Sequence, residues 1–274
     1  MIIFLHIPKT AGSTFQFILE KNFGLFHCHT NHASQHDYKS HAGRKPFGQS
    51  ELEFARKIFP VLRSLAGHNL TAPLSLQAPQ PFHMTFLREP VARVLSQYQE
   101  RTLINRAGGR PTPGFEEALQ TDGELQNLHV KLMGGGENLD EAKRYLERCD
   151  FVGLTEKFDL SLQVFEKLYP GKINLRYRKM RVAPDDSIKN AIKKDARLMA
   201  LAREYNRLDV ELYDFAVKEI FPRLCARAGS RPEDQAASLA DESLAFTPGL
   251  LAGRFYNQTI YRQLCKLRNR HAVA

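Results

Sequence analysis

The stretch Ile2–Leu19 reads IIFLHIPKTAGSTFQFIL and decides the fold that we expect for this chain. Its first residues are apolar and typical of a buried strand, the turn Pro8–Thr14 follows, and apolar residues then recur at helical spacing. A strand, a tight turn and a helix N-terminus together hold phosphate well, because the first N–H groups of a helix lack partners and carry partial positive charge. We therefore predict an anion site at this turn.

The side chains of the turn suit such a site. Lys9 adds a full charge, and Gly12 allows the backbone to approach a ligand closely. The turn is not a Walker A loop, in which lysine directly precedes the magnesium-binding serine or threonine. An ordinary helix with Ser13 or Thr14 as its N-cap is the alternative. The predicted phosphate-binding residues are Lys9, Thr10, Ala11, Gly12, Ser13 and Thr14.

A second motif lies at residues 83–98, HMTFLREPVARVLSQY. A short apolar strand ends before Arg88, Pro90 starts a helix, and Ser96 falls two turns into it. Arg88 and Ser96 are predicted to meet one phosphate, the arginine through its bidentate fork. Arg93, on the same helix, is expected to pair with a glutamate at 89 or 100.

The first motif resembles the 5′-phosphosulfate loop of sulfotransferases that use 3′-phosphoadenosine 5′-phosphosulfate (PAPS), and the second resembles their 3′-phosphate site. The resemblance is to bacterial relatives of the heparan sulfate 2-O-sulfotransferase branch and extends over about Ile2 to Phe221. It implies PAPS as donor, adenosine 3′,5′-bisphosphate (PAP) as product, and a hydroxyl of a carbohydrate or glycolipid as acceptor. A non-catalytic module that binds a bisphosphorylated nucleotide or an acidic glycan is the alternative, and a P-loop kinase is a weaker one.

The resemblance also assigns the catalytic residues. It implies a histidine base at the end of a central strand, and His68 follows an apolar stretch and Gly67. Histidine titrates near the operating pH of such a reaction. Lys9 would stabilise the charge on the leaving phosphate, and no metal is required, since lysine, arginine and backbone donors carry the electrostatic stabilisation. A histidine satisfied by a backbone carbonyl is the alternative.

Three further segments are assigned by the same resemblance. Asn127 is expected to contact substrate. In the basic segment 174–181, Arg178 and Lys179 would add to 3′-phosphate binding, and Tyr177 would stack on adenine. A solvated basic loop is the alternative for that segment.

A run of histidines follows the first helix, but its spacing matches no zinc motif. We expect residues 28–48 to form a polar loop that contacts the acceptor. These histidines are His27, His29, His32, His36 and His41.

Strand-like and helical stretches alternate through the middle of the chain. Helices are predicted at 90–106, 115–133 with an interruption near 122–123, 139–149 and 158–168, and strands at 151–154 and 173–175. Such alternation predicts an α/β fold with a P-loop-like central parallel sheet flanked by helices. We expect a sulfotransferase domain with its donor site at residues 1–222 and a helical C-terminal extension at 223–274.

The extension begins with a polar linker and ends in a basic amphipathic helix over 253–270. The helical stripe of Tyr256, Ile260, Leu264 and Leu267 is expected to pack on the main domain or on a second subunit, giving a possible homodimer. Peripheral contact with an anionic membrane through its five basic residues is the alternative. These are Arg254, Arg262, Lys266, Arg268 and Arg270.

Composition sets outer limits. The 274 residues are 43% hydrophobic, enough for a sizeable core, and the net charge of +9 favours an anionic ligand. No nucleic-acid motif is present. We find no signal peptide and no apolar run long enough to span a membrane, and the four cysteines form no motif, so we expect a cytoplasmic protein.

Overall fold

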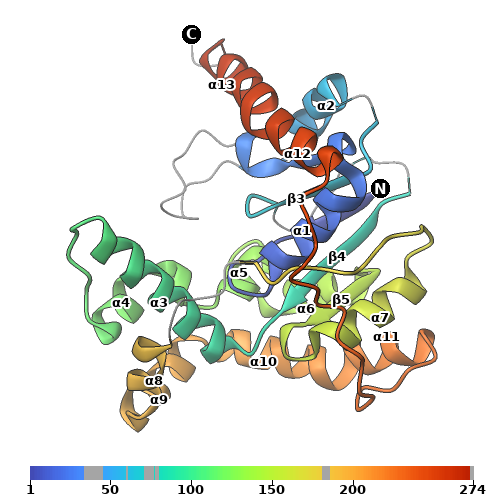
Figure 1. The fold of residues 1–274 in the computed structure, drawn as a ribbon. Coiled ribbons are helices and arrows are strands. Elements are labelled where there is room, and N and C mark those ends of the chain that lie inside the picture. The colour runs from blue at the N-terminus through green and yellow to red at the C-terminus, as the bar shows by residue number, and fades with distance from the viewer. Residues whose placement is uncertain (34–45, 60, 71–76, 78–79, 181–185, 272–274) are drawn as a thin grey trace.

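The computed structural model describes residues 1–33, 46–59, 61–70, 77, 80–180 and 186–271. Its centre is a five-stranded parallel sheet in the order β2-β3-β1-β4-β5, as Figure 1 shows. The predicted α/β fold with a central parallel sheet is therefore confirmed. The strands are β1 (Ile2–Leu5), β2 (His27–His29), β3 (Ser64–Gly67), β4 (Phe82–Leu87) and β5 (Phe151–Leu154).

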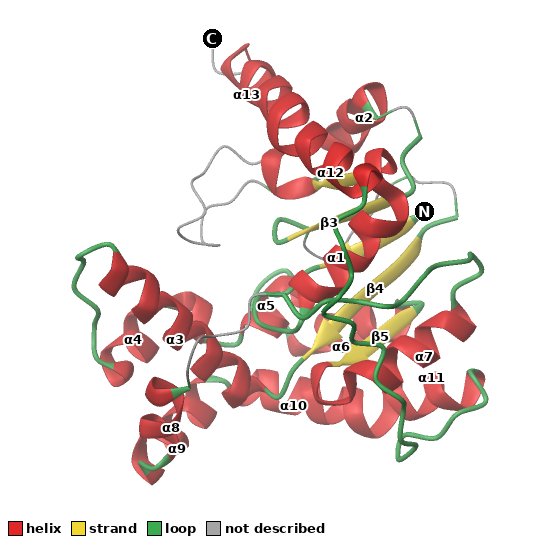
Figure 2. Ribbon diagram, viewed as in Figure 1, coloured by secondary structure: helices red, strands yellow, loops and turns green. Residues whose placement is uncertain are grey.

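Helices cover both faces of the sheet (Figure 2), so its central strand is apolar at every position. Ile2 and Phe4 pack in the larger core cluster with α1, whereas Ile3 packs in a second cluster with α2 and α13. The described α-helices are α1 (Gly12–Phe23), α2 (Gln49–Ile58), α3 (Pro90–Ala107), α4 (Phe115–Thr121), α5 (Leu128–Gly134), α6 (Leu139–Arg148), α7 (Phe158–Leu168), α8 (Ser187–Lys193), α9 (Ala196–Tyr205), α10 (Arg207–Phe215), α11 (Phe221–Arg227), α12 (Pro248–Phe255) and α13 (Arg262–His271).

Two local predictions were wrong. Residues 173–175 form no strand; instead, the side chain of Asn22 donates to the carbonyl oxygen of Asn174 and accepts from its N–H, at 2.9 and 2.8 Å. The backbone of Asn174 is therefore paired with a side chain and not with a neighbouring strand. The histidine run, expected to be loop from residue 28, begins with the edge strand β2 and continues as a short helical turn, η2 (Thr30–Ala33). Residues 34–45, with His36 and His41, lie outside the described part of the chain.

The residues after 222 pack on the same body as the rest of the chain. Leu224 and Leu250 belong to the larger core cluster, and Tyr261 belongs to the second one. The expected linker runs beside the segment 172–180, which we call the strap: the N–H of Tyr177 donates to the carbonyl of Leu239 at 3.1 Å. The C-terminal extension thus packs against the main fold and shares its core.

The predicted packing face of the C-terminal helix was wrong for three of its four residues, since only Tyr256 packs on the second core cluster as expected. Residues 248–271 form one continuous helix, in which the π-helical segment η6 (Tyr256–Tyr261) joins α12 to α13. A π-helix turns less per residue than an α-helix, so spacings of four residues stay on one face. That buried face consists of Gly253, Asn257, Tyr261, Cys265 and Asn269, whereas Ile260, Leu264 and Leu267 are exposed. Within the described residues, no helix has the length and apolar character needed to cross a bilayer.

Two fully buried histidines make stability depend on pH. Burial lowers the pKa of His27 and of His129 from 6.5 to about 4. Between these values the unfolded chain binds protons that the folded chain does not, so stability falls as the pH drops, by about 1.4 kcal/mol per pH unit for each histidine. Urea denaturation at about pH 7 and about pH 5.5 measures this slope. His27→Gln should reduce it, and an unchanged slope would contradict the assignment.

Candidate functional site

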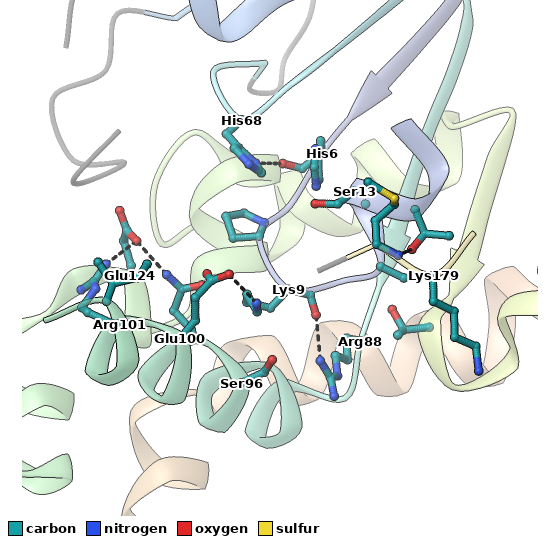
Figure 3. Close-up of a pocket in the computed structure, with 18 of the residues that line it drawn as sticks. His6, Lys9, Ser13, His68, Arg88, Ser96, Glu100, Arg101, Glu124 and Lys179 are labelled. Carbon is teal, nitrogen blue, oxygen red and sulfur yellow. Dashed lines mark hydrogen bonds and ion pairs between the residues drawn. The ribbon is translucent and has the colours of Figure 1, made fainter. Parts of the chain in front are cut away.

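A cavity of about 990 Å³ lies at the edge of the sheet where the parallel strands end (Figure 3). The turn after β1, the residue after β3, the helix α3 and the end of the strap all line it. This is where an open parallel sheet binds its ligands. Of the residues predicted from the sequence, the cavity contains Lys9, Ala11, Gly12, Ser13, Thr14, His68, Arg88, Ser96 and Lys179.

The turn after β1 presents the N-terminus of α1 to the cavity. Lys9 and Ala11 both adopt left-handed backbone conformations, with φ of 68° and 60°, and α1 begins at Gly12. Ala11 is the N-cap and no side chain caps the helix, so the alternative of Ser13 or Thr14 as N-cap was wrong. Both residues line the cavity. The N–H groups at the N-terminus of α1 have no side-chain cap and can bind an anion.

Thr10 differs from its neighbours, because its side chain is buried and its hydroxyl donates to the carbonyl of Ile7 at 2.9 Å. It shapes the turn and does not line the cavity. Thr14 combines both functions: its hydroxyl lines the cavity and accepts a hydrogen bond from the N–H of Met180 at 3.2 Å. This bond brings the end of the strap, with Lys179, to the mouth of the site.

Gly12 is required for a steric reason. A Cβ at this position would lie 1.9 Å from Cδ2 of His6, which follows β1 and also lines the cavity. His6 was not among the site residues predicted from the sequence. Its position directly after the central strand was the signal available, since residues at that edge face the ligand.

Three cationic or hydroxyl groups meet on the α3 side of the cavity. The Lys9 ammonium pairs with the Glu100 carboxylate at 3.0 Å, and Nη1 of Arg88 donates to the carbonyl of Lys9 at 3.1 Å. The pKa of Arg88 is lowered, because the effect of burial outweighs the opposing effect of three nearby carboxylates. Ser96 lies on the same side, as Figure 3 shows. The predicted pair of Arg88 and Ser96 therefore shares one cavity with the α1 N-terminus.

His68 directly follows β3 and lines the cavity. Its Nδ1 lies 2.7 Å from the carbonyl oxygen of His6, and its ring centroid lies 4.1 Å from that of His6. Because a carbonyl only accepts hydrogen bonds, Nδ1 carries the proton and Nε2 of the neutral ring has the lone pair. The side chain of Asn31 accepts from the His68 N–H at 2.6 Å and fixes the backbone. The backbone carbonyl thus fixes the orientation of the ring, as the alternative of a histidine satisfied by a carbonyl expected.

Arg93 has a different partner from the one expected. It is fully buried, and its Nη2 donates to the carbonyl of Glu124 at 2.9 Å. Burial lowers its pKa to about 10, while the charges of Asp209 and Glu124 oppose that shift. Glu89 instead caps α3, and Glu100 is the partner of Lys9. Arg93 belongs to the core beneath the site.

Asn127 does not line the cavity, contrary to its expected contact with substrate. It is buried with a left-handed backbone, and its Oδ1 accepts from the N–H of Leu208 at 3.1 Å. In return, Oδ1 of Asn206 accepts from the Asn127 N–H at 3.0 Å. We call this reciprocal arrangement, together with Asp209, the polar lock. Asn127 holds α5 against α10 and does not enter our proposed site.

The strap contributes only one of its three predicted residues. Tyr177 is buried, and its hydroxyl donates to the Asp159 carboxylate at 3.1 Å, which leaves no face for adenine. Arg178 lies near Glu242 and over the ring of Phe246, outside the cavity lining. Lys179 lines the cavity as expected.

The histidines of β2 and η2 lie away from the cavity wall. His27 is fully buried with Nδ1 2.8 Å from the Ser64 hydroxyl, and the rings of His29 and His32 are tilted by 35° with their centroids 5.0 Å apart. Burial lowers the pKa of His32 to about 4. Among the described residues no group of three or more His, Cys, Asp or Glu side chains is arranged to hold a metal ion.

The other end of the cavity follows α3 beyond Ser96 and was not predicted from the sequence. The lining residues that belong to α3 recur at helical spacing from Ser96, and that periodicity was the signal available. Arg101 pairs there with Glu124 at 2.7 Å and with Asp122. The additional lining residues are Gln97, Glu100, Arg101, Ile104, Asn105, Arg110 and Glu124.

Two comparisons with known proteins bear on this site. A model described as the sulfotransferase family matches residues 1–148, which contain the anion turn, His68, Arg88 and Ser96. The heparan sulfate 2-O-sulfotransferase hst-2 of Caenorhabditis elegans is 22% identical, over 83% of this chain and 80% of that protein. The strap and the C-terminal helix lie beyond the part that the family model matches.

Proposed function

Since this chain belongs to the sulfotransferase family, we propose that it transfers a sulfuryl group from PAPS to a hydroxyl of a carbohydrate or glycolipid acceptor. The observation that carries the proposal is one cavity that is lined by two sets of cationic and hydrogen-bond-donating groups and by a histidine. The open N-terminus of α1 and Lys9 form one set, and Arg88 with Ser96 forms the other. His68 lies in the same cavity. The glycan named for the nematode relative supports the acceptor class.

In the proposed mechanism, the α1 N-terminus, Lys9 and the Ser13 hydroxyl bind the 5′-phosphosulfate. Arg88, Ser96 and Lys179 bind the 3′-phosphate through charge-assisted hydrogen bonds. The acceptor hydroxyl oxygen attacks sulfur, the bond from sulfur to the bridging phosphate oxygen breaks, and Nε2 of His68 takes the hydroxyl proton. The hydrogen bond from Nδ1 of His68 to the His6 carbonyl supports the resulting imidazolium.

Lys9 changes partner on donor binding in this scheme. In the structure its ammonium is held by Glu100 at 3.0 Å, on the wall of the same cavity. A phosphosulfate at the α1 N-terminus offers a stronger anionic partner, because the helix dipole and Lys9 act on it together. Lys9 then neutralises the charge that develops on the leaving PAP.

Binding of PAP tests the donor assignment. Calorimetry without magnesium should detect PAP, and Arg88→Ala should weaken its binding about 10- to 100-fold, because charge-assisted hydrogen bonds contribute about 1.5–3 kcal/mol each. Arg106→Ala is the matched control, since this exposed arginine of α3 lies outside the cavity lining and should leave affinity unchanged. A preference for magnesium-ATP over PAP would contradict the proposal and favour a kinase.

The acceptor is identified by turnover. Incubation of the protein with sulfur-labelled PAPS and an extract of glycans and lipids from its host should label a carbohydrate-bearing product. PAP binding without transfer to any fraction would favour the non-catalytic module.

A further inference from the structure

The C-terminal helix leaves an apolar stripe in solvent. Five of the ten large apolar side chains that are exposed among the described residues lie on this one element. Phe255 is 62% exposed, and Leu251 is 53% exposed. The opposite face packs on the second core cluster through Tyr261 and Cys265. The apolar stripe consists of Leu251, Phe255, Ile260, Leu264 and Leu267.

The π segment makes this separation of faces continuous. Tyr256–Tyr261 keeps the small and polar residues of the helix on its buried face, where Asn257 donates to the carbonyl of His27 at 2.8 Å. The five residues of the apolar stripe thereby face solvent, whereas Leu250 and Tyr261 of the same helix are buried. A contiguous exposed apolar surface of this kind marks an interaction site.

Basic side chains accompany the apolar stripe. Residues 248–271 contain five Lys and Arg and no Asp or Glu. Arg254 and Arg268 have partners on the main body, at Glu20 and Glu51. The basic stripe of Arg262, Lys266 and Arg270 is exposed, and no ion pair to any described residue involves it. This face therefore presents apolar and cationic groups together.

The apolar and cationic side chains on this face indicate which kind of partner it binds. A second copy would bring one cationic helix against another with no acidic residue on the helix to compensate, which disfavours a symmetric dimer through this face. An anionic lipid surface accepts apolar side chains at its acyl boundary and cationic side chains at its headgroups. We propose that the exposed face of the C-terminal helix docks this protein on an anionic lipid surface, with the helix lying in the interface.

Co-sedimentation with vesicles tests this proposal. The protein should bind vesicles of equal parts phosphatidylglycerol and phosphatidylcholine about 10-fold or more better than pure phosphatidylcholine vesicles, because each basic residue near an anionic surface adds attraction. The double variant Leu251→Glu with Phe255→Glu should weaken binding about 10-fold or more, since binding scales with buried apolar area. Both side chains are exposed, so the fold should persist, which circular dichroism checks.

A charge reversal and its matched control complete the experiment. Arg262→Glu with Lys266→Glu should weaken binding to the anionic vesicles about 10-fold or more. Lys193→Glu with Arg203→Glu changes net charge equally on the exposed surface of α8 and α9, far from α13 in Figure 1, and should change binding less than about 2-fold, because salt screens distant charges.

Three outcomes would overturn the proposal. The first is equal binding to zwitterionic and anionic vesicles. The second is an equal loss in the charge reversal and its control, which would indicate net charge alone. The third is a dimer that Leu251→Glu with Phe255→Glu dissociates, which would make a second copy the occupant. The assay uses no sulfuryl donor, so its result is independent of the proposed function.

Discussion

Replacing His68 with alanine is expected to lower the turnover of sulfuryl transfer by about 100-fold or more, because general base catalysis contributes about 10²–10⁴. The base needs a lone pair on Nε2, and the His6 carbonyl secures it by accepting from Nδ1 at 2.7 Å. His68 does not belong to either anion-binding set. Binding of PAP should therefore be retained within a few-fold in the same variant, and calorimetry with a single-turnover assay measures both quantities.

A second histidine provides the matched control. His83 lies at the start of β4, away from the strand end that carries Arg88, and does not line the cavity. His83→Gln should leave turnover unchanged. If His68→Ala leaves turnover unchanged as well, the base is another group. If His68→Ala abolishes PAP binding together with turnover, His68 maintains the structure of the binding site and does not act as the base.

Replacing Asp209 with alanine is expected to destabilise the protein by about 3–5 kcal/mol, the usual cost of leaving a buried charge without its compensating partner. The Asp209 carboxylate is fully buried and accepts from the N–H groups of His129 and Val130 at 3.0 and 2.9 Å, so it caps the start of α5. It also compensates the buried guanidinium of Arg93. Both contributions are lost in the variant, and urea denaturation measures the change in unfolding free energy.

Two comparisons separate these contributions. Asp214→Ala removes an exposed carboxylate that pairs with Lys218 at 2.8 Å, and it should cost less than about 1 kcal/mol. Arg93→Met in the Asp209→Ala background removes the orphaned cation and should recover part of the loss. A loss for Asp209→Ala no larger than that for Asp214→Ala would show that the polar lock contributes little to stability.

The sequence predicted the parts of the fold and site whose signals are local. The apolar run Ile2–Leu5 and the turn after it lie within one short segment, so strand, turn and helix could be inferred together. Arg88 lies between the end of β4 and the start of α3, and Ser96 lies within the first two turns of α3, so their spacing follows from one short segment without any distant contact. His68 was identified by its place at a strand end and by resemblance. All three therefore lie in the cavity as expected.

The failures involve contacts between distant segments. Asn127 lies outside the cavity lining because its hydrogen-bond partners are about 80 positions away, at Asn206 between α9 and α10 and at Leu208 in α10. Tyr177 was misassigned because Asp159 and the later segment at Leu239 bury it. Neither partner can be inferred from the periodicity of the residues around it. The packing face of the C-terminal helix was missed because helical spacing assumes a uniform turn, and η6 alters that turn.

The strap lies outside the part of the chain that the family model matches, so Lys179 can vary among related chains independently of the cavity residues within that part. The turn after β1, His68, Arg88 and Ser96 lie within the part that the family model matches, whereas Lys179 reaches the cavity on a segment beyond it. That segment is held by later residues still, since the N–H of Asp241 donates to the carbonyl of Tyr177 at 2.7 Å. Under the proposed function, changes in the last quarter of the chain would therefore alter how long the nucleotide stays bound and leave His68 and the turn after β1 unchanged.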